Sequence, residues 1–106
     1  MSRFMRIIVF FDLPVVLKKE RKAYSQFRKF LLNDGYVMLQ YSVYSRICNG
    51  EDGVRKHMKR LRENLPPVNG AIRAMKITEK QFENMEILLG TTVVEEELGA
   101  KKIDFF

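Results

Sequence analysis

The sequence has few of the residues that support disulfide or zinc chemistry. It contains one cysteine, Cys48, and one histidine, His57, among 106 residues. A single cysteine cannot form a disulfide within the chain, and one cysteine with one histidine cannot complete a four-ligand zinc site there. We therefore expect a reducing, cytoplasmic setting.

Long apolar runs are also missing. No run approaches the roughly 20 residues that a membrane span needs, so we expect no membrane partner. The start, M-S-R-F-M-R, lacks the small-residue cleavage site of a signal peptide. Hydrophobic content of 46% and charged content of 30% are typical of a soluble globular protein. We predict one domain over residues 1–90 and a C-terminal tail over residues 91–106.

Acidic residues are scarce over most of the chain. Residues 1–78 carry 16 Lys and Arg against 6 Asp and Glu, whereas residues 79–106 carry 3 against 7. A body this basic suggests a polyanionic partner, with nucleic acid as the first candidate. The alternative is a basic protein whose lysines only keep it in solution.

The stretch Arg3–Pro14 is almost continuously apolar and ends on one carboxylate, Asp12. Its β-branched and aromatic residues and its terminal breaker predict a buried strand. Both alternating sides of the strand are apolar, although a sheet face exposed to water should be polar. The sequence therefore predicts a homodimer in which two copies pack sheet to sheet around a two-fold axis.

The remaining pattern predicts the other elements of the fold. We expect helices over 15–32 and 54–65, the first closed by Gly35, and a long strand region over 36–47 with a bend or bulge near Leu39-Gln40. A further strand is expected over 71–77, a capped helical turn over 79–84 and a short strand over 86–89. This order predicts an α+β fold, the ferredoxin-like βαββαβ sandwich with two helices on one face of an antiparallel sheet.

Asp12 is the candidate metal ligand and catalytic residue. At the end of a strand it could bind Mg²⁺ or Mn²⁺, which commonly use one or two protein carboxylates with substrate phosphates and water. The alternative is that Asp12 caps the following helix. In a dimer the carboxylate occurs twice, and metal-activated water could then attack a phosphodiester. We expect His57 on the surface and see no sign that Cys48 is activated.

Basic side chains on the two predicted helices are the candidate nucleic-acid contacts. Such contacts need only Lys and Arg at a surface and do not depend on base sequence, so backbone or duplex binding is favoured over base readout. The alternative is an ordinary solvated helix face. The candidate nucleic-acid-binding residues are Lys18, Lys19, Arg21, Arg46, Lys59 and Arg62.

Five segments together resemble one family. They are V-F-F-D-L-P (9–14), K-K-E-R-K-A-Y-x-x-F-R-K-F-L (18–31), Y-V-M-L-Q-Y-S-V-Y-x-R (36–46), L-P-P-V-N-G-A-I-R (65–73) and I-T-E-K-Q-F-E (77–83). Together they resemble the small core subunit of the CRISPR adaptation machinery, the second of the two near-universal CRISPR-associated proteins, in its type II-like branch. The resemblance covers residues 3–90.

The resemblance implies a ferredoxin-like homodimer that bridges dimers of the integrase subunit. Together they capture foreign double-stranded DNA and insert it as a new spacer in antiviral defence. The dimer holds the duplex backbone, and the integration chemistry belongs to the partner subunit. In the family, the C-terminal segment helps to dock the integrase subunit or crosses to the other protomer, and the resemblance implies this role for the terminus Ile103–Phe106.

The family is also described as a metal-dependent endoribonuclease, with activity on single-stranded RNA or double-stranded DNA. Its proposed metal ligand is the aspartate that matches Asp12. Some members have tyrosine immediately before this aspartate, where the present chain has Phe11 and no hydroxyl. A third alternative is a basic, toxin-like ribonuclease of similar fold.

Overall fold

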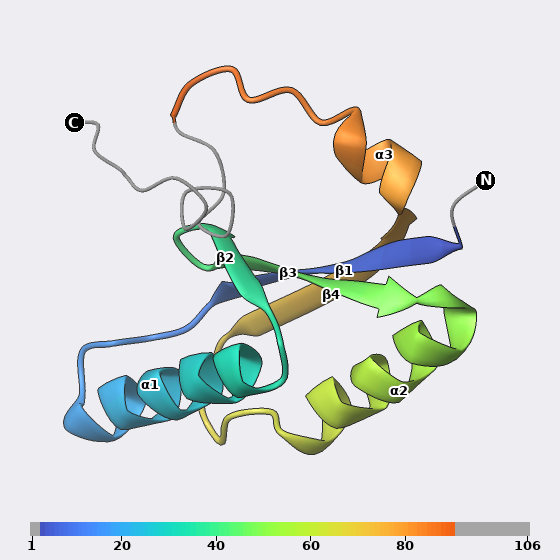
Figure 1. Cartoon of the computed structure of the whole chain (residues 1–106). Coiled ribbons are helices and arrows are strands. Elements are labelled where there is room, and N and C mark those ends of the chain that lie inside the picture. The colour runs from blue at the N-terminus through green and yellow to red at the C-terminus, as the bar shows by residue number, and fades with distance from the viewer. Residues whose placement is uncertain (1–2, 91–106) are drawn as a thin grey trace.

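The computed structural model describes residues 3–90 as one layer of strands and one layer of helices, followed by a short helix (Figure 1). The predicted tail over residues 91–106 lies outside the described residues. In chain order the elements are β1 (Phe4–Asp12), α1 (Lys18–Asn33), β2 (Val37–Gln40), β3 (Val43–Asn49), α2 (Gly50–Glu63), β4 (Ala71–Thr78) and α3 (Glu79–Glu83).

The four strands form one antiparallel sheet in the order β2-β3-β1-β4. The apolar strand β1 is central, and Ile8 stands opposite Ser45 on β3 and Met75 on β4. A central position suits this strand because both of its faces are apolar and both of its edges need partners. The predicted α+β, ferredoxin-like arrangement is confirmed.

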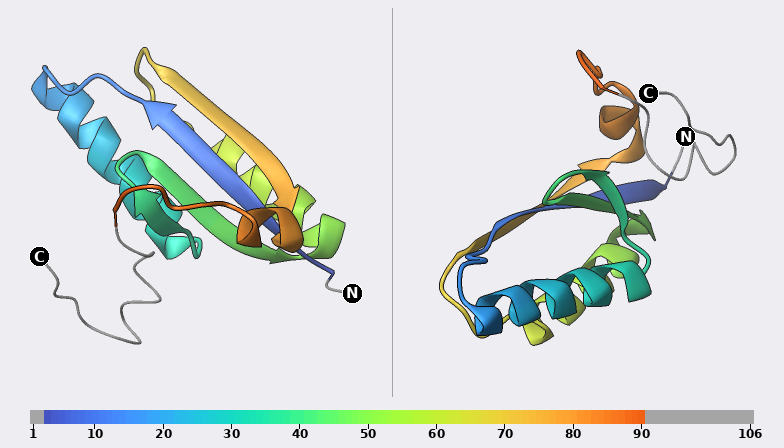
Figure 2. Two further views of the ribbon diagram at one scale, coloured as in Figure 1. Left: turned by 90° about the horizontal axis from the view of Figure 1, so that it is seen from above. Right: turned by 90° about the vertical axis from the view of Figure 1, so that its left-hand side faces the viewer.

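Helices α1 and α2 cover one face of the sheet (Figure 2). The side chains of Ile7, Val9 and Phe11 point toward them and are buried, as strand alternation predicts. Each helix contributes one apolar stripe to the same core. The buried residues are Ala23, Phe27 and Leu31 on α1, and Val54, His57 and Leu61 on α2.

The opposite face of the sheet, called the open face below, has no long helix over it in the described part of the chain. Helix α3 and residues 84–90 pass on this side (Figures 1 and 2). Between this segment and the sheet lies a groove of about 730 Å³, lined by Ile8, Phe10 and Met75 among others. Phe10 is 40% exposed and Met75 48%, so the open face keeps apolar area in contact with solvent.

The strand region predicted over 36–47 is a hairpin. Strand β2 ends at Gln40, Tyr41 and Ser42 form the turn, and β3 begins at Val43. Ser42 has φ of 65°, a left-handed conformation that serine adopts only rarely. The expected irregularity exists as a register shift between Met38 and Gln40. Because the chain reverses here, residues 37–49 form two antiparallel strands and not one long strand with a bend.

Three predicted boundaries are corrected. Helix α1 starts at Lys18 and not at residue 15. Helix α2 starts at Gly50 and not at residue 54, because residues 50–53 already form its first helical turn. The strand predicted over 86–89 is absent, since residues 85–90 have no regular structure and pair with no strand of the described chain. The capped turn after Thr78 is confirmed as α3, and Gly35 has the expected positive φ of 92°.

No helix among residues 3–90 is long and apolar enough to cross a membrane.

Candidate nucleic-acid interface and strand-end carboxylate

Asp12 is the last residue of β1 and is exposed. It pairs with Ala71 on β4, and it shares the parity of Ile8 and Phe10, which line the groove on the open face. Strand alternation therefore places its carboxylate on the side of the sheet away from α1 and α2. A second copy packed on this face would bring a second Asp12 to the same side.

The backbone at Asp12 is held closely by the loop that precedes β4. A Cβ atom added to Gly70 would lie 2.9 Å from the carbonyl oxygen of Asp12 and 2.9 Å from Cδ2 of Leu13. The loop can pass this close only because glycine has no side chain. The packing of Gly70 against the backbone of Asp12 therefore restrains the position of this residue and its carboxylate.

The alternative role for Asp12, as cap of the following helix, is wrong. Helix α1 begins six residues later, and Glu20 caps it instead. The Oε1 atom of Glu20 accepts hydrogen bonds from the backbone N–H groups of Leu17, at 2.8 Å, and Val16, at 3.1 Å. The carboxylate of Asp12 is therefore not used by the helix terminus.

The donors at this strand end fit a hard divalent cation only in part. Asp12 supplies carboxylate oxygens, which Mg²⁺ and Mn²⁺ prefer. Among residues 3–90, no three His, Cys, Asp or Glu side chains lie together in a group suited to a metal ion. One chain thus offers one carboxylate at this position. The ligands would suit Mg²⁺ or Mn²⁺ if a second Asp12 and the phosphates of a substrate completed the coordination.

Helix α1 presents most of the free positive charge. Lys18 and Lys19 are exposed at its first turn. Arg21, also exposed, donates hydrogen bonds to the carbonyl oxygens of Val16, at 2.5 Å, and Val15, at 3.3 Å, so its guanidinium lies over the β1–α1 loop. Further exposed cations on this helix are Lys22, Arg28 and Lys29.

Helix α2 is less basic than its sequence suggested, because its first turn includes Glu51 and Asp52. Lys59 pairs with Glu63 at 2.5 Å. Arg62 is exposed, and no hydrogen bond or ion pair is formed by its side chain within the described residues. Of the two predicted contacts on α2, Arg62 is therefore free within the described residues, whereas Lys59 is paired with Glu63.

Arg46 has a structural task in the monomer. Its Nε atom donates to the carbonyl oxygen of Asp34 at 2.7 Å, and its guanidinium lies within 3.3 Å of the position a Cβ atom would take on Gly35. The side chain thus closes the C-terminal end of α1, where carbonyl groups lack helical partners. It remains a predicted nucleic-acid contact, set beside α1 and only partly exposed.

His57 is buried and not on the surface, which corrects the sequence-based expectation. Only 5% of the residue is exposed, and its Nδ1 atom lies 2.8 Å from Oδ2 of Asp34. Oδ1 of the same carboxylate accepts from Arg60 at 2.6 Å. The helical spacing from Val54 and to Leu61 placed His57 on the buried stripe and was the signal that could have located it.

The carboxylate of Asp34 titrates at unusually low pH. Burial alone would raise its pKa, but the hydrogen bonds from His57 and Arg60 and their positive charges outweigh burial and lower the pKa. The group is therefore ionised at neutral pH and joins the end of α1 to α2. The sequence pattern did not single out Asp34.

Cys48 and Tyr36 lie in the same core and show no sign of activation. Burial raises the pKa of the Cys48 thiol, which disfavours the nucleophilic thiolate. Burial also raises the pKa of Tyr36, and its hydroxyl has no hydrogen-bond partner within the described residues. Cys48 is thus a buried free thiol, and sequence analysis likewise found nothing that marks it as activated.

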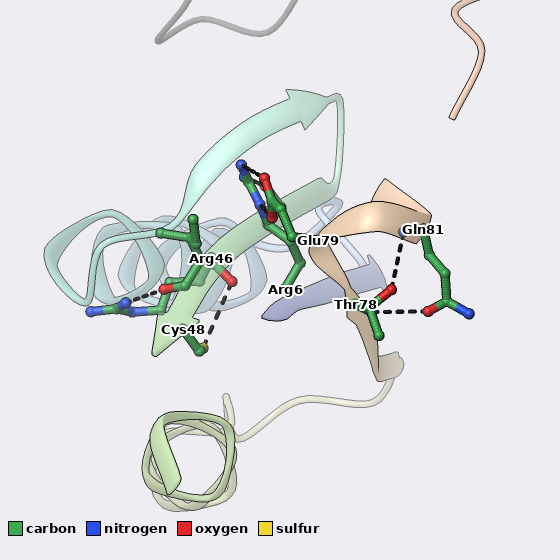
Figure 3. A network of polar contacts seen from close by, with 8 residues as sticks. Arg6, Arg46, Cys48, Thr78, Glu79 and Gln81 are labelled. Atoms are coloured by element: carbon green, nitrogen blue, oxygen red, sulfur yellow. Dashed lines mark hydrogen bonds and ion pairs between the residues drawn. The ribbon is translucent and has the colours of Figure 1, made fainter. Parts of the chain in front are cut away.

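An ion pair on the open face anchors α3 (Figure 3). Arg6 donates two hydrogen bonds to Glu79, with Nε–Oε1 of 2.8 Å and Nη2–Oε2 of 3.1 Å, and both side chains are largely buried. The guanidinium carbon of Arg6 also lies 4.0 Å from the centre of the Phe82 ring. Arg6, the charged residue in the interior of β1, thus holds α3 against the sheet. Helix α3 is the start of the segment that passes over the groove.

The chain is similar over almost its whole length to known proteins. Residues 5–85 match the family described as CRISPR associated protein Cas2. A protein from Acidovorax ebreus is 53% identical over 96% of this chain and all of its own. Relatives from Flavobacterium psychrophilum (44%; 98% of this chain, 90% of the relative) and Campylobacter jejuni (47%; 92% and 68%) are also similar. All three are named CRISPR-associated endoribonuclease Cas2.

The fold and site define a small α+β protein with one open sheet face, a basic helix layer and a single carboxylate at the end of its central strand. With residues 5–85 matched, the chain belongs to the CRISPR associated protein Cas2 family. The resemblance inferred from the five sequence segments is therefore confirmed.

Proposed function

We propose that the protein is a subunit of CRISPR adaptation that dimerises, binds duplex protospacer DNA and bridges dimers of the integrase subunit during spacer acquisition. The observation that carries the proposal is the division of the molecule into two surfaces. The open face retains apolar side chains around Phe10 and Met75, which suits a second copy. The opposite side carries the exposed lysines and arginines of α1.

Binding by these cations should follow the physics of counterion release. Each phosphate neutralised by Lys or Arg steepens the fall of affinity with salt by about 0.9 in the logarithmic slope. Because a dimer presents each cation twice, a few residues per chain can support an extended contact with duplex backbone. The contact needs no base-specific side chain.

The test is charge reversal on the helix layer. Changing Lys18, Lys19 and Arg62 to glutamate should weaken duplex binding by about tenfold or more and flatten its salt dependence. Lys59→Glu, which removes a lysine already paired with Glu63, is the matched control and should have a smaller effect. Duplex affinity measured by fluorescence anisotropy at several salt concentrations reports both quantities. Unchanged affinity in the triple variant contradicts the assignment of this surface.

A second candidate function is favoured by the names of the relatives and by the position of Asp12. The curated relatives are named endoribonucleases, and here the carboxylate is exposed at the end of the central strand. We propose that two copies of Asp12, contributed by the dimer, hold Mg²⁺ or Mn²⁺ for cleavage of single-stranded RNA or double-stranded DNA. A bound cation would generate a hydroxide nucleophile and stabilise charge on the phosphate.

Asp12→Asn separates the two functions, because it keeps the shape of the side chain and removes its charge. We expect cleavage to fall by at least about a hundredfold and duplex binding to stay within about twofold of wild type. Asp52→Asn, an exposed acid on α2, is the control. If the purified Asp12→Asn protein cleaves as fast as wild type, the nuclease does not use this carboxylate. Integration assays with the integrase subunit would then show whether the scaffold role needs any cleavage.

A further inference from the structure

Two tyrosines form a stacked pair at the surface, next to the end of β1. Tyr41 lies in the turn between β2 and β3 and is 78% exposed, whereas Tyr24 lies on α1 and is half-buried. Their ring centres are 6.4 Å apart and their planes differ by 26°. A large aromatic side chain gains free energy from burial, so the core does not explain a ring left in solvent.

The pair is supported from below by the core. The ring of Tyr24 contacts that of Phe11 at 5.7 Å, edge to face, and Phe11 in turn packs on Phe27 and Tyr44. One face of the pair therefore rests on buried aromatic rings, and Tyr41 is the outermost member of the stack. A ring held in this way loses little conformational freedom when a ligand stacks on it.

The turn itself is also fixed. The carbonyl oxygen of Ser42 accepts a hydrogen bond from the backbone N–H of Phe11 at 3.1 Å, and Ser42 holds a positive φ. Phe11 immediately precedes Asp12, so this hydrogen bond ties the tyrosine turn to the end of β1 that carries the carboxylate. The stacked pair and Asp12 thus lie at the same end of the sheet, the pair on the side of α1 and the carboxylate on the open face.

Positive charge flanks the pair on α1. Arg21 is one turn before Tyr24 and Arg28 is one turn after it, and both are exposed. A tyrosine phenol is neutral at physiological pH because its ordinary pKa is 10.0, and a hydrogen bond with Tyr24 raises the pKa of Tyr41 further. A neutral aromatic surface between two cations matches the alternation of base and phosphate along a single strand.

We infer that Tyr41, supported by Tyr24, is a stacking platform for an unpaired nucleobase of single-stranded RNA. The inference rests on the proposed endonuclease function, for which it names the substrate class and the element that holds it. Duplex DNA does not offer an unpaired base face along its length, so the platform favours single strands. Stacking depends little on base identity, because every base has a π-face.

The test compares two probes and two conservative variants of the whole protein. Tyr41→Leu keeps an apolar side chain without an aromatic face and should weaken binding of a short fluorescein-labelled single-stranded RNA by about five- to a hundredfold. Tyr41→Phe keeps the ring and should stay within about twofold of wild type. Binding of a duplex DNA of the same length should be unchanged in both. Val16→Ala, at another highly exposed apolar position, is the control.

Tyrosine emission gives an independent signal, since the sequence has four tyrosines and no tryptophan. Stacking of a base on Tyr41 should quench part of this emission in wild type, and the quenching should be smaller in Tyr41→Phe. If wild type and Tyr41→Leu bind RNA with equal affinity, the stacking platform is refuted and the proposed endonuclease function is not. The same holds if Tyr41→Leu loses equal affinity for RNA and for duplex DNA. Absence of RNA binding in wild type overturns both the platform and the proposed action on RNA.

Discussion

At the scale of single residues, the carboxylate of Asp34 connects more of the fold than any other side chain described here. The two carboxylate oxygens form hydrogen bonds with His57 and Arg60 of α2. The main-chain carbonyl oxygen of Asp34 accepts a hydrogen bond from Arg46 of β3. Arg46 and Arg60 are cationic and His57 can become so, and hydrogen bonds to charged groups are the stronger kind. One residue in a helix-terminal turn thus sets the position of both helices.

We expect Asp34→Asn to lower the free energy of unfolding by about 2–4 kcal/mol, because it weakens two bonds to a largely buried carboxylate and leaves their donors poorly paired. Urea unfolding measures the change. Asp52→Asn, which breaks an exposed pair with Arg55, should cost less than about 1 kcal/mol. Equal costs for the two variants would contradict the importance assigned to Asp34.

The same carboxylate predicts a pH dependence. Its folded pKa lies below the ordinary value of 3.8, so the unfolded chain takes up the proton first as the pH falls. The stabilisation from Asp34 is therefore complete above about pH 4 and is lost as the pH falls through the folded pKa. The stability difference between wild type and Asp34→Asn should narrow below pH 4, as urea titrations at a series of pH values would show.

Residue-level prediction from the sequence succeeded where periodicity was simple and failed where partners were distant. The alternation of side chains along β1 correctly placed Ile7 and Val9 on one face of the sheet, in the core under the helices, and Ile8 and Phe10 on the other, where they line the groove. His57 was expected on the surface, yet it is buried against Asp34, which lies 23 residues away in the sequence. A buried polar side chain needs such a partner, and spacing along one helix cannot reveal it.

At the scale of elements, α3 depends on contacts with β1 as much as on its own cap. Thr78 and Gln81 form the predicted capping box, with hydrogen bonds of 3.1 and 2.9 Å (Figure 3). A helix of five residues is too short to be stable alone. The ion pair between Arg6 and Glu79 and the Phe82 ring supply the remaining stabilisation.

Replacing one partner of this ion pair should be worse than replacing both. Arg6→Met or Glu79→Gln alone should cost about 1–3 kcal/mol, since each leaves a largely buried group with a poor partner. The double variant should recover part of that loss. A double-mutant cycle by urea unfolding measures the coupling, and hydrogen exchange over residues 79–84 reports the loosening of α3. Strict additivity of the two changes would show that the pair contributes nothing.

Element boundaries were the least predictable part of the fold. The start of α1 moved because Glu20 caps the backbone at Leu17, and a capping carboxylate inside a run of lysines gives a weak signal. The hairpin at Tyr41 and Ser42 was hidden because neither residue is one that favours the positive φ of a two-residue hairpin turn. The hydrogen bond from the Phe11 N–H to the Ser42 carbonyl oxygen helps to hold Ser42 in its left-handed conformation. Tertiary contacts decided both cases.

At the scale of the whole molecule, the open face is the feature that a single chain leaves incomplete. Met75 and Phe10 are partly exposed there beside the groove, and Leu88 and Leu89 on the segment across it are almost fully exposed. A second copy packed against this face would remove apolar area from water and bring two Asp12 residues to one side.

We therefore expect Met75→Lys to weaken the proposed dimer, because two new charges would be buried in the contact between the two sheets. The dissociation constant should rise by about tenfold or more, measured by light scattering after size-exclusion chromatography. Ala74→Lys places the same charge on the next residue of β4, which is exposed on the opposite face, and should leave the mass unchanged. A dimer that persists in Met75→Lys would show that the contact lies elsewhere.

The order of the strands also bears on how the chain is made. The central strand β1 is synthesised first, but its second neighbour, β4, ends 66 residues after Asp12, at Thr78. At 5–20 residues per second, this apolar strand waits roughly 3 to 13 seconds on the ribosome for its last partner. Arg3, Arg6 and Asp12 are the charges in and beside it, and such charges oppose aggregation of exposed strands. The charge of Arg6 would therefore oppose aggregation of the nascent strand, before the side chain pairs with Glu79 in the finished fold.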